Sequence, residues 1–256
     1  MDYTLKKSLG QHFLHDEGIC RKIVDQLTVT AGMNLLEVGP GGGAITKYIL
    51  QLQGINYQAV EIDREKIVYL LKNLPAIQDK ITEGDILKVP APFETSFDII
   101  GNFPYNISSQ ILFRILEWEP LVNVAIGMFQ KEVGQRISAG PGSKTYGILS
   151  VLMQAFFKVE YLFEVHENCF TPPPAVKSAV LRFTNLHDPY HIADRRKFTL
   201  LVKTAFNQRR KTLRNALKSI LPPAMLQDDI MSKRAEQLGV TDFVNLYNTY
   251  KEHQQA

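Results

Sequence analysis

The chain has 256 residues, 45% of them hydrophobic, and a formal net charge of +3, which suits a large α/β domain with a small appended domain. It contains no run of about 18 apolar residues, and its first residues lack the apolar stretch of a signal peptide. We therefore expect a soluble, cytoplasmic protein. Cys20 and Cys169 have no Cys or His at metal-ligand spacing, which predicts free thiols and excludes a zinc site.

Short apolar runs rich in β-branched residues alternate with helical patterns through the first part of the chain. The predicted strands, in chain order, are residues 34–38, 57–62, 97–101 and 122–128. The predicted helices between them are residues 45–52, 64–74 and 108–118. This alternation predicts an α/β fold with a mainly parallel sheet.

Two later strands, 158–165 and 178–183, are joined by a stretch that contains three consecutive prolines. The connection is shorter than the dozen or more residues of a parallel crossover, so this pair is predicted to be antiparallel. A polar linker with a proline follows, and the chain beyond it is helical and basic. We therefore predict an α/β domain over 1–186 and a helical domain over 187–256.

A glycine-rich turn over residues 39–43 follows the first strand and opens a helix. Such a turn lets the backbone approach a ligand closely and directs helix N–H groups at it. The spacing Gly39-x-Gly41-x-x-Ala44 also fits a dinucleotide fingerprint, with Glu61 about 20 residues further on to bind ribose. The turn alone therefore leaves the cofactor open.

Acidic residues accompany this turn: Glu37 lies within the strand at 34–38, Glu61 is at the end of the strand at 57–62, and Asp85 follows a further strand that precedes the one at 97–101. Ligands of open α/β sheets bind at the carboxyl ends of the strands. There Glu61 can accept the hydroxyls of a ribose, and Asp85 can accept the amino group of an adenine. The pattern resembles the cofactor site of Rossmann-like methyltransferases that use S-adenosylmethionine, although each acid alone could be a solvated strand end.

The motif Asn102-Phe103-Pro104-Tyr105 follows the strand at 97–101 and so lies at the same edge of the sheet. An adenine amine is a weak nucleophile because its lone pair is delocalised into the ring. Hydrogen bonds to the Asn102 side-chain oxygen and the Pro104 carbonyl would aim that lone pair at a methyl donor. Pro104 stiffens the loop, and Tyr105 offers a stacking face. Alone, the motif could also be a simple turn beside a buried tyrosine.

Asn-x-Pro-Tyr behind an apolar strand resembles adenine-N6 methyltransferases, and nearly the whole chain resembles the ribosomal RNA small-subunit adenine dimethyltransferase family. The segments that carry this resemblance are residues 7–14, 130–133, 140–147, 170–176 and 206–211. It implies a Rossmann-like methyltransferase domain with a mainly parallel seven-stranded sheet whose last strand is antiparallel, plus a small all-helical C-terminal domain. The implied reaction places methyl groups on N6 of two adjacent adenines in the 3′-terminal hairpin of 16S ribosomal RNA.

The resemblance also implies which residues act. Those expected to bind S-adenosylmethionine are His12, Leu14, Gly39, Gly41, Glu61, Asp85, Ile86 and Asn102. Those expected to hold the flipped adenine are Asn102, Pro104, Tyr105 and Phe170, with Phe170 on the ring face opposite Tyr105. Two positions depart from the family pattern: His12 replaces a usual Asn, and Phe103, whose side chain is expected in the core, replaces a usual Leu.

Residues 195–218 contain nine Lys or Arg and no acid, which suggests a polyanionic partner. A helix is predicted over 206–217, and the residues expected to bind RNA are Arg209, Arg210, Lys211 and Arg214. A solvated helix face is the alternative. The expected partner is small-subunit ribosomal RNA or the immature small subunit, bound by a monomer without metal.

Rival functions remain. Within the class, the chain could be a 23S ribosomal RNA adenine methyltransferase of the antibiotic-resistance type, which shares the glycine turn and the Asn-x-Pro motif. A nicotinamide-dependent oxidoreductase shares the glycine turn, but no convincing hydride-transfer set is evident near it. A non-catalytic assembly factor would need neither Asn102 nor Tyr105, and both are present.

Overall fold

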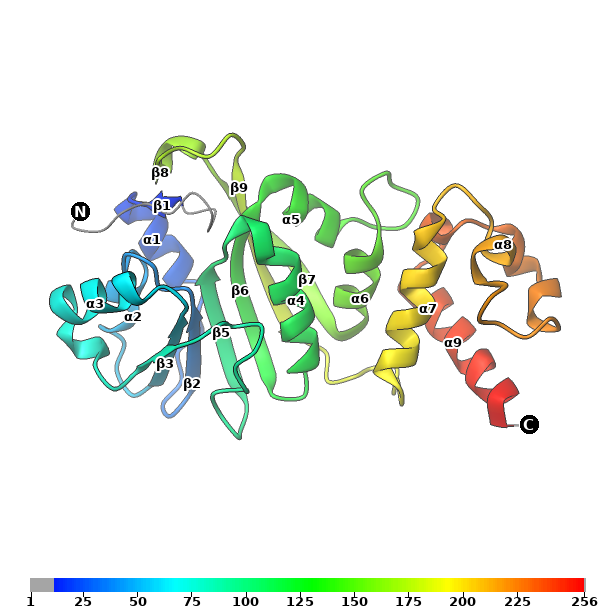
Figure 1. Ribbon diagram of the computed structural model, residues 1–256, viewed down its shortest axis with the longest axis horizontal. Coiled ribbons are helices and arrows are strands. Elements are labelled where there is room, and N and C mark those ends of the chain that lie inside the picture. Colours follow the sequence, from blue (N-terminus) through cyan, green and yellow to red (C-terminus); the bar gives the residue numbers. More distant parts are fainter. Residues whose placement is uncertain (1–11, 256) are drawn as a thin grey trace. The chain divides into compact units, whose positions relative to one another are not determined.

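The computed structural model describes residues 12–255, so residues 7–11 of the predicted cofactor-covering segment lie outside the described part. The chain divides into two compact units (Figure 1). The first unit runs to Gly134 and resumes over Glu160–Asn185, and the second comprises Gln135–Val159 and the residues from Leu186 onward. Residues 135–159, predicted as part of the α/β domain, thus belong to the second compact unit.

Seven strands form the main sheet, in the order β4-β3-β2-β5-β6-β9-β7 (Figure 1). Their bounds are β2 Asn34–Val38, β3 Asn56–Glu61, β4 Ile81–Glu83, β5 Phe97–Asn102, β6 Val122–Gln130, β7 Phe157–Val165 and β9 Ser178–Asn185. Neighbours from β4 to β6 pair in parallel, and β9 runs antiparallel to β6. The predicted fold class is confirmed.

The first unit contains helices α1 to α4, of which α2, α3 and α4 follow β2, β3 and β5 at the edge of the sheet where the pocket lies. Their bounds are α1 Glu17–Val24, α2 Thr46–Ile49, α3 Arg64–Asn73 and α4 Ser108–Glu117, and α5 Lys131–Ser138 crosses into the second unit. The predicted helix over 45–52 shrinks to α2, because the N–H groups of Gln51 and Leu52 bond the carbonyls three residues back and tighten the chain into a turn.

A two-stranded sheet pairs β1 (Phe13–Leu14) with β8 (Phe170–Thr171) in antiparallel fashion, with Leu14 opposite Phe170. Both of these side chains are buried in an apolar cluster of the first unit that also contains Cys20 and Val165. The pairing joins segments that are far apart in sequence, so local patterns could not predict it.

The second unit is mainly helical, and its described residues from 187 onward agree with the predicted helical C-terminal region. Its helices are α6 Ile148–Phe156, α7 Arg195–Asn207, α8 Leu213–Leu217 and α9 Val240–Gln255. Helices α6, α7 and α9 contact one another, and rings packed edge to face, such as Phe198 against Tyr247, fill the space between them.

The predicted helix over 206–217 is wrong. Helix α7 ends at Asn207, a turn follows, and α8 begins only at Leu213. Thr212 has an extended backbone and forms a β-bridge with Arg234. The Leu213 N–H donates to the Lys233 carbonyl at 2.8 Å. This tertiary pairing overrides the local helical pattern, so the basic residues from Arg209 to Lys211 lie in a turn.

Phe103 anchors the loop that follows β5. Its ring is fully buried and lies above Gly101 and Gly127, which are opposite each other on β5 and β6. A Cβ atom would come within 2.6 Å of the Phe103 ring at Gly101 and within 2.5 Å at Gly127. The two glycines therefore make room for the ring, which confirms the expectation that Phe103 faces the core.

No helix within residues 12–255 is both long enough and apolar enough to cross a membrane.

Candidate functional site

A pocket opens in the first unit at the carboxyl ends of β2, β3, β4 and β5. It is lined by all the residues predicted to bind the cofactor, which are His12, Leu14, Gly39, Gly41, Glu61, Asp85, Ile86 and Asn102. Pro104 and Tyr105 line it as well. The structure therefore brings the glycine turn, the rim acids and the Asn-x-Pro-Tyr loop to one place.

The glycine turn is held against β3 by its own backbone. Gly39, Gly41 and Gly43 all have positive φ angles, between 58° and 80°, which side chains rarely tolerate. The Gly39 N–H donates to the Val60 carbonyl at 2.9 Å, and the Gly41 N–H donates to Glu61 Oε2 at 3.0 Å. The turn is thus preformed beside the end of β3.

Glu61 connects two walls of the pocket. While Oε2 accepts the Gly41 N–H, Oε1 accepts the N–H of Asp63 at 3.0 Å, at the start of α3. The carboxylate is almost fully buried yet lines the pocket. Since each carboxylate oxygen can accept more than one hydrogen bond, Glu61 can hold the turn and a ligand at the same time.

Glu37 lies outside the pocket lining and is fully buried. Thr46 Oγ1 donates to its Oε1 at 2.9 Å, and the Tyr57 hydroxyl donates to its Oε2 at 2.5 Å. Burial raises the pKa of Glu37 from 4.5 to about 7. Glu37 therefore links β2, α2 and β3 beside the glycine turn rather than contacting a ligand.

We expect Glu37→Gln to change how stability depends on pH. Because the pKa of Glu37 is higher in the folded than in the unfolded state, its protonation stabilises the fold. This contribution to the unfolding free energy is fully present below pH 4.5 and is lost as the pH rises through 7. Between these limits the unfolding free energy of the wild type should fall by about 3 kcal/mol more than that of the variant. Asp98, whose pKa burial raises to about 6, is the same in both proteins. Urea unfolding at several pH values tests this, and parallel profiles would contradict it.

Asp85 and Ile86 follow β4 on the opposite side of the pocket from Asn102. Asp85 Oδ1 accepts the Leu87 N–H at 3.0 Å, and Oδ2 lies 3.6 Å from Lys88 Nζ. Lys66 and Ile62 also line the pocket, although the sequence analysis did not identify them. Their place around the start of the helix that follows Glu61 is the signal that could have indicated them, since such helix starts face ligands.

The loop after β5 holds Tyr105 by its hydroxyl group. That hydroxyl shares a hydrogen bond of 2.5 Å with Ser178 Oγ on β9. The ring of His12 stacks on Tyr105 with centroids 5.6 Å apart, and His12 Nδ1 donates to the Pro172 carbonyl at 2.9 Å. The aromatic neighbour of Tyr105 in this structure is therefore His12. Phe170, predicted to lie on the adenine face opposite Tyr105, is 1% exposed and does not line the pocket.

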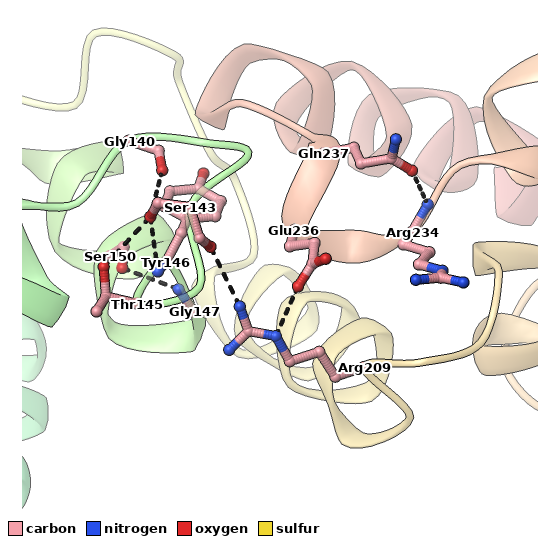
Figure 2. Close-up of polar contacts among 10 residues, drawn as sticks. All are labelled: Gly140, Ser143, Thr145, Tyr146, Gly147, Ser150, Arg209, Arg234, Glu236 and Gln237. Carbon is pink, nitrogen blue, oxygen red and sulfur yellow. Dashed lines mark hydrogen bonds and ion pairs between the residues drawn. The ribbon is translucent and has the colours of Figure 1, made fainter.

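The predicted RNA-binding residues lie in the second unit and differ in their surroundings. Arg210, Lys211 and Arg214 are exposed, and Arg214 Nε donates to the Leu226 carbonyl. Arg209 points between Ser143 and Glu236 (Figure 2), with Nε 2.7 Å from Glu236 Oε2. Within the described residues, no group of three His, Cys, Asp or Glu is placed to hold a metal ion.

Comparisons with known proteins cover nearly the whole chain. A family model described as ribosomal RNA adenine dimethylase matches residues 3–252. The ribosomal RNA small subunit methyltransferase A of Phocaeicola vulgatus is 50% identical over 250 residues, 95% of this chain and 88% of that protein. A dimethyladenosine transferase structure from Plasmodium falciparum superposes with a TM-score of 0.81 at 24% identity, covering 95% of this chain and 98% of its own.

The structure of the 23S rRNA methyltransferase ErmE superposes with a TM-score of 0.68 at 23% identity, covering 93% of this chain and 99% of its own. At identities of 24% and 23%, these two structures indicate the fold alone. The family match and the identity to the Phocaeicola protein go further, and they show that the chain belongs to the ribosomal RNA adenine dimethylase family.

Proposed function

We propose that the chain transfers methyl groups from S-adenosylmethionine to N6 of two adjacent adenines in the 3′-terminal hairpin of 16S ribosomal RNA. The product is N6,N6-dimethyladenosine, formed in the cytoplasm during small-subunit biogenesis. The observation that carries the proposal is that the Asn102–Tyr105 loop and the glycine turn line one pocket. The relatives' common name, small subunit methyltransferase A, favours the small subunit over the 23S alternative.

The residues of the pocket fit S-adenosylmethionine. Glu61 offers a carboxylate to a ribose diol, Asp85 offers one to an adenine amine, and the apolar Ile62 and Ile86 add contact area for a flat ring. When bound, this cofactor supplies a methyl group activated by a positively charged sulfur.

The Asn102 loop would hold and orient the target adenine. The Asn102 side-chain oxygen and the Pro104 carbonyl accept the N6–H groups, which leaves the nitrogen lone pair free to face the methyl group. The Tyr105 ring, fixed by Ser178, provides the stacking face for a base removed from its own stack. Orientation then supplies most of the rate, since the proton can leave after the methyl group has arrived. For Phe170, contact with the base stays a prediction for the RNA-bound protein.

Methylation of purified subunits tests the proposed function. Under-methylated small subunits and large-subunit RNA are incubated separately with the protein and labelled S-adenosylmethionine, and modified adenines are mapped by mass spectrometry. N6,N6-dimethyladenosine in the small-subunit RNA is expected. Methylation of only the large-subunit RNA would establish the 23S alternative, and no methylation of either RNA would favour a non-catalytic assembly factor.

The exposed basic residues of the second unit would bind RNA phosphates. We expect Arg210→Ala with Lys211→Ala to weaken RNA binding and to reduce the slope of log affinity against log salt by about 1 to 2. Lys158→Ala with Lys251→Ala removes two positive charges from exposed positions of the second unit outside the basic run at 195–218, and it serves as the control. Binding is measured by fluorescence anisotropy at several salt concentrations. An unchanged slope in the first variant would show that this turn is not at the RNA.

A further inference from the structure

Arg209 joins three segments of the second unit. Its Nε donates to Glu236 Oε2 at 2.7 Å, and its Nη2 donates to the Ser143 carbonyl at 3.2 Å (Figure 2). The carbonyl of Glu236 in turn accepts the Gly142 N–H at 2.7 Å. The guanidinium and Glu236 thus form a clamp between the basic turn at 208–211 and the loop at 140–147.

The loop at 140–147 has its own internal order. Ser143 Oγ donates to the Gly140 carbonyl and accepts the Tyr146 N–H, both at 3.1 Å (Figure 2). Tyr146 is fully buried and packs edge to face against Phe206 on α7. The loop is therefore anchored at its end by Tyr146, and the clamp attaches the part around Gly142 and Ser143.

Exposed cations lie directly beside the clamp in sequence. Lys144 follows Ser143, and Arg210 and Lys211 follow Arg209; all three are exposed, whereas Arg209 is partly buried. Two of the Arg209 donors are already used within the protein. Arg209 is thus placed to organise neighbouring cations rather than to reach a phosphate in the same way as Arg210.

We infer that Arg209 and Glu236 are positioning residues that hold the loop at 140–147 against the basic turn, so that Lys144, Arg210 and Lys211 present one phosphate-binding surface to RNA. The inference rests on the proposed RNA substrate. By its charge alone Glu236 repels RNA phosphates, so removing it should strengthen RNA binding. As a positioning residue Glu236 favours RNA binding, so removing it should weaken binding. That difference in sign makes the inference testable.

The test compares Glu236→Ala with Glu236→Gln. Glutamine keeps an oxygen that can accept the Arg209 N–H, whereas alanine removes it. We expect Glu236→Ala to weaken binding to small-subunit ribosomal RNA by about fivefold and Glu236→Gln to stay within about twofold of wild type, given the modest strength of half-exposed pairs. Arg209→Ala should match Glu236→Ala, and the double variant should be no weaker than either single variant.

Two further measurements separate positioning from misfolding. Affinity for S-adenosylmethionine should be unchanged in every variant, because its proposed site lies in the first unit. Backbone amide exchange over 140–147 should be faster in Glu236→Ala and Arg209→Ala than in Glu236→Gln.

The inference is overturned if Glu236→Ala binds RNA as tightly as wild type or more tightly. If Arg210→Ala with Lys211→Ala still weakens binding in that case, the proposed RNA contact stands without the clamp. If Arg210→Ala with Lys211→Ala binds RNA as tightly as wild type, both the clamp and the proposed RNA contact of the basic turn are contradicted.

Discussion

Asn102→Ala is expected to slow methyl transfer by about 100- to 1,000-fold, a loss typical of removing one group that orients or polarises the reacting atoms. The side chain lies at the end of β5 and lines the pocket, beside a loop fixed by the buried Phe103. Alanine removes the oxygen that would accept an N6–H and leaves those anchors in place. The amine then loses one of its two acceptors and its orientation, but the base retains its stacking face.

Single-turnover assays at saturating cofactor measure this effect apart from any change in cofactor binding. Asn73→Ala is the control, because it removes the same side chain from an exposed position at the end of α3, outside the pocket lining. RNA affinity should be unchanged in both variants, since the basic turn lies elsewhere in the chain. Wild-type turnover by Asn102→Ala would refute the acceptor role.

Glu61→Ala is expected to weaken S-adenosylmethionine binding by about 100-fold or more. A hydrogen bond to a charged group is worth about 1.5 to 3 kcal/mol, and the variant loses the acceptor for two ribose hydroxyls. It also releases the N–H groups of Gly41 and Asp63, which Glu61 holds in place on both sides of the pocket. The loss therefore combines ligand contacts with the shape of the glycine turn.

Calorimetric titration measures this change in affinity. Glu65→Ala removes the same charge from an exposed position of α3 outside the pocket lining, and it should bind the cofactor normally. Titrating the wild type with NAD in the same experiment also tests the oxidoreductase alternative. Cofactor affinity within about twofold of wild type in Glu61→Ala would show that the ribose is bound elsewhere.

Six of the seven strands of the main sheet, all but the short β4, and the pocket were predictable because their signals are local. Apolar runs mark the buried strands, and the glycines at 39–43 mark the turn, since only glycine readily adopts its positive φ angles. Strand ends then gather at one edge by the geometry of a parallel sheet, so Glu61, Asp85 and Asn102 could be assigned to one site.

Features that depend on tertiary contacts could not be predicted in this way. The break between α7 and α8 follows from the bridge of Thr212 with Arg234, which no local periodicity reveals. The burial of Phe170 follows from its pairing with Leu14, and the His12 ring on Tyr105 follows from the same approach of two distant segments. The partner of Arg209 likewise comes from a separate part of the chain.

The fit of Phe103 over two glycines restricts which substitutions the neighbouring strands can accept. A Cβ atom at Gly101 would lie 2.6 Å from the Phe103 ring and 2.7 Å from the Val38 carbonyl oxygen, and one at Gly127 would lie within 2.8 Å of both the Phe103 and the Phe129 rings. The position of Phe103 is therefore coupled to residues on β5 and β6, although only Phe103 of these three positions lines the pocket. A side chain introduced at Gly127, outside the pocket lining, would displace the ring that anchors the loop of Asn102 and Tyr105.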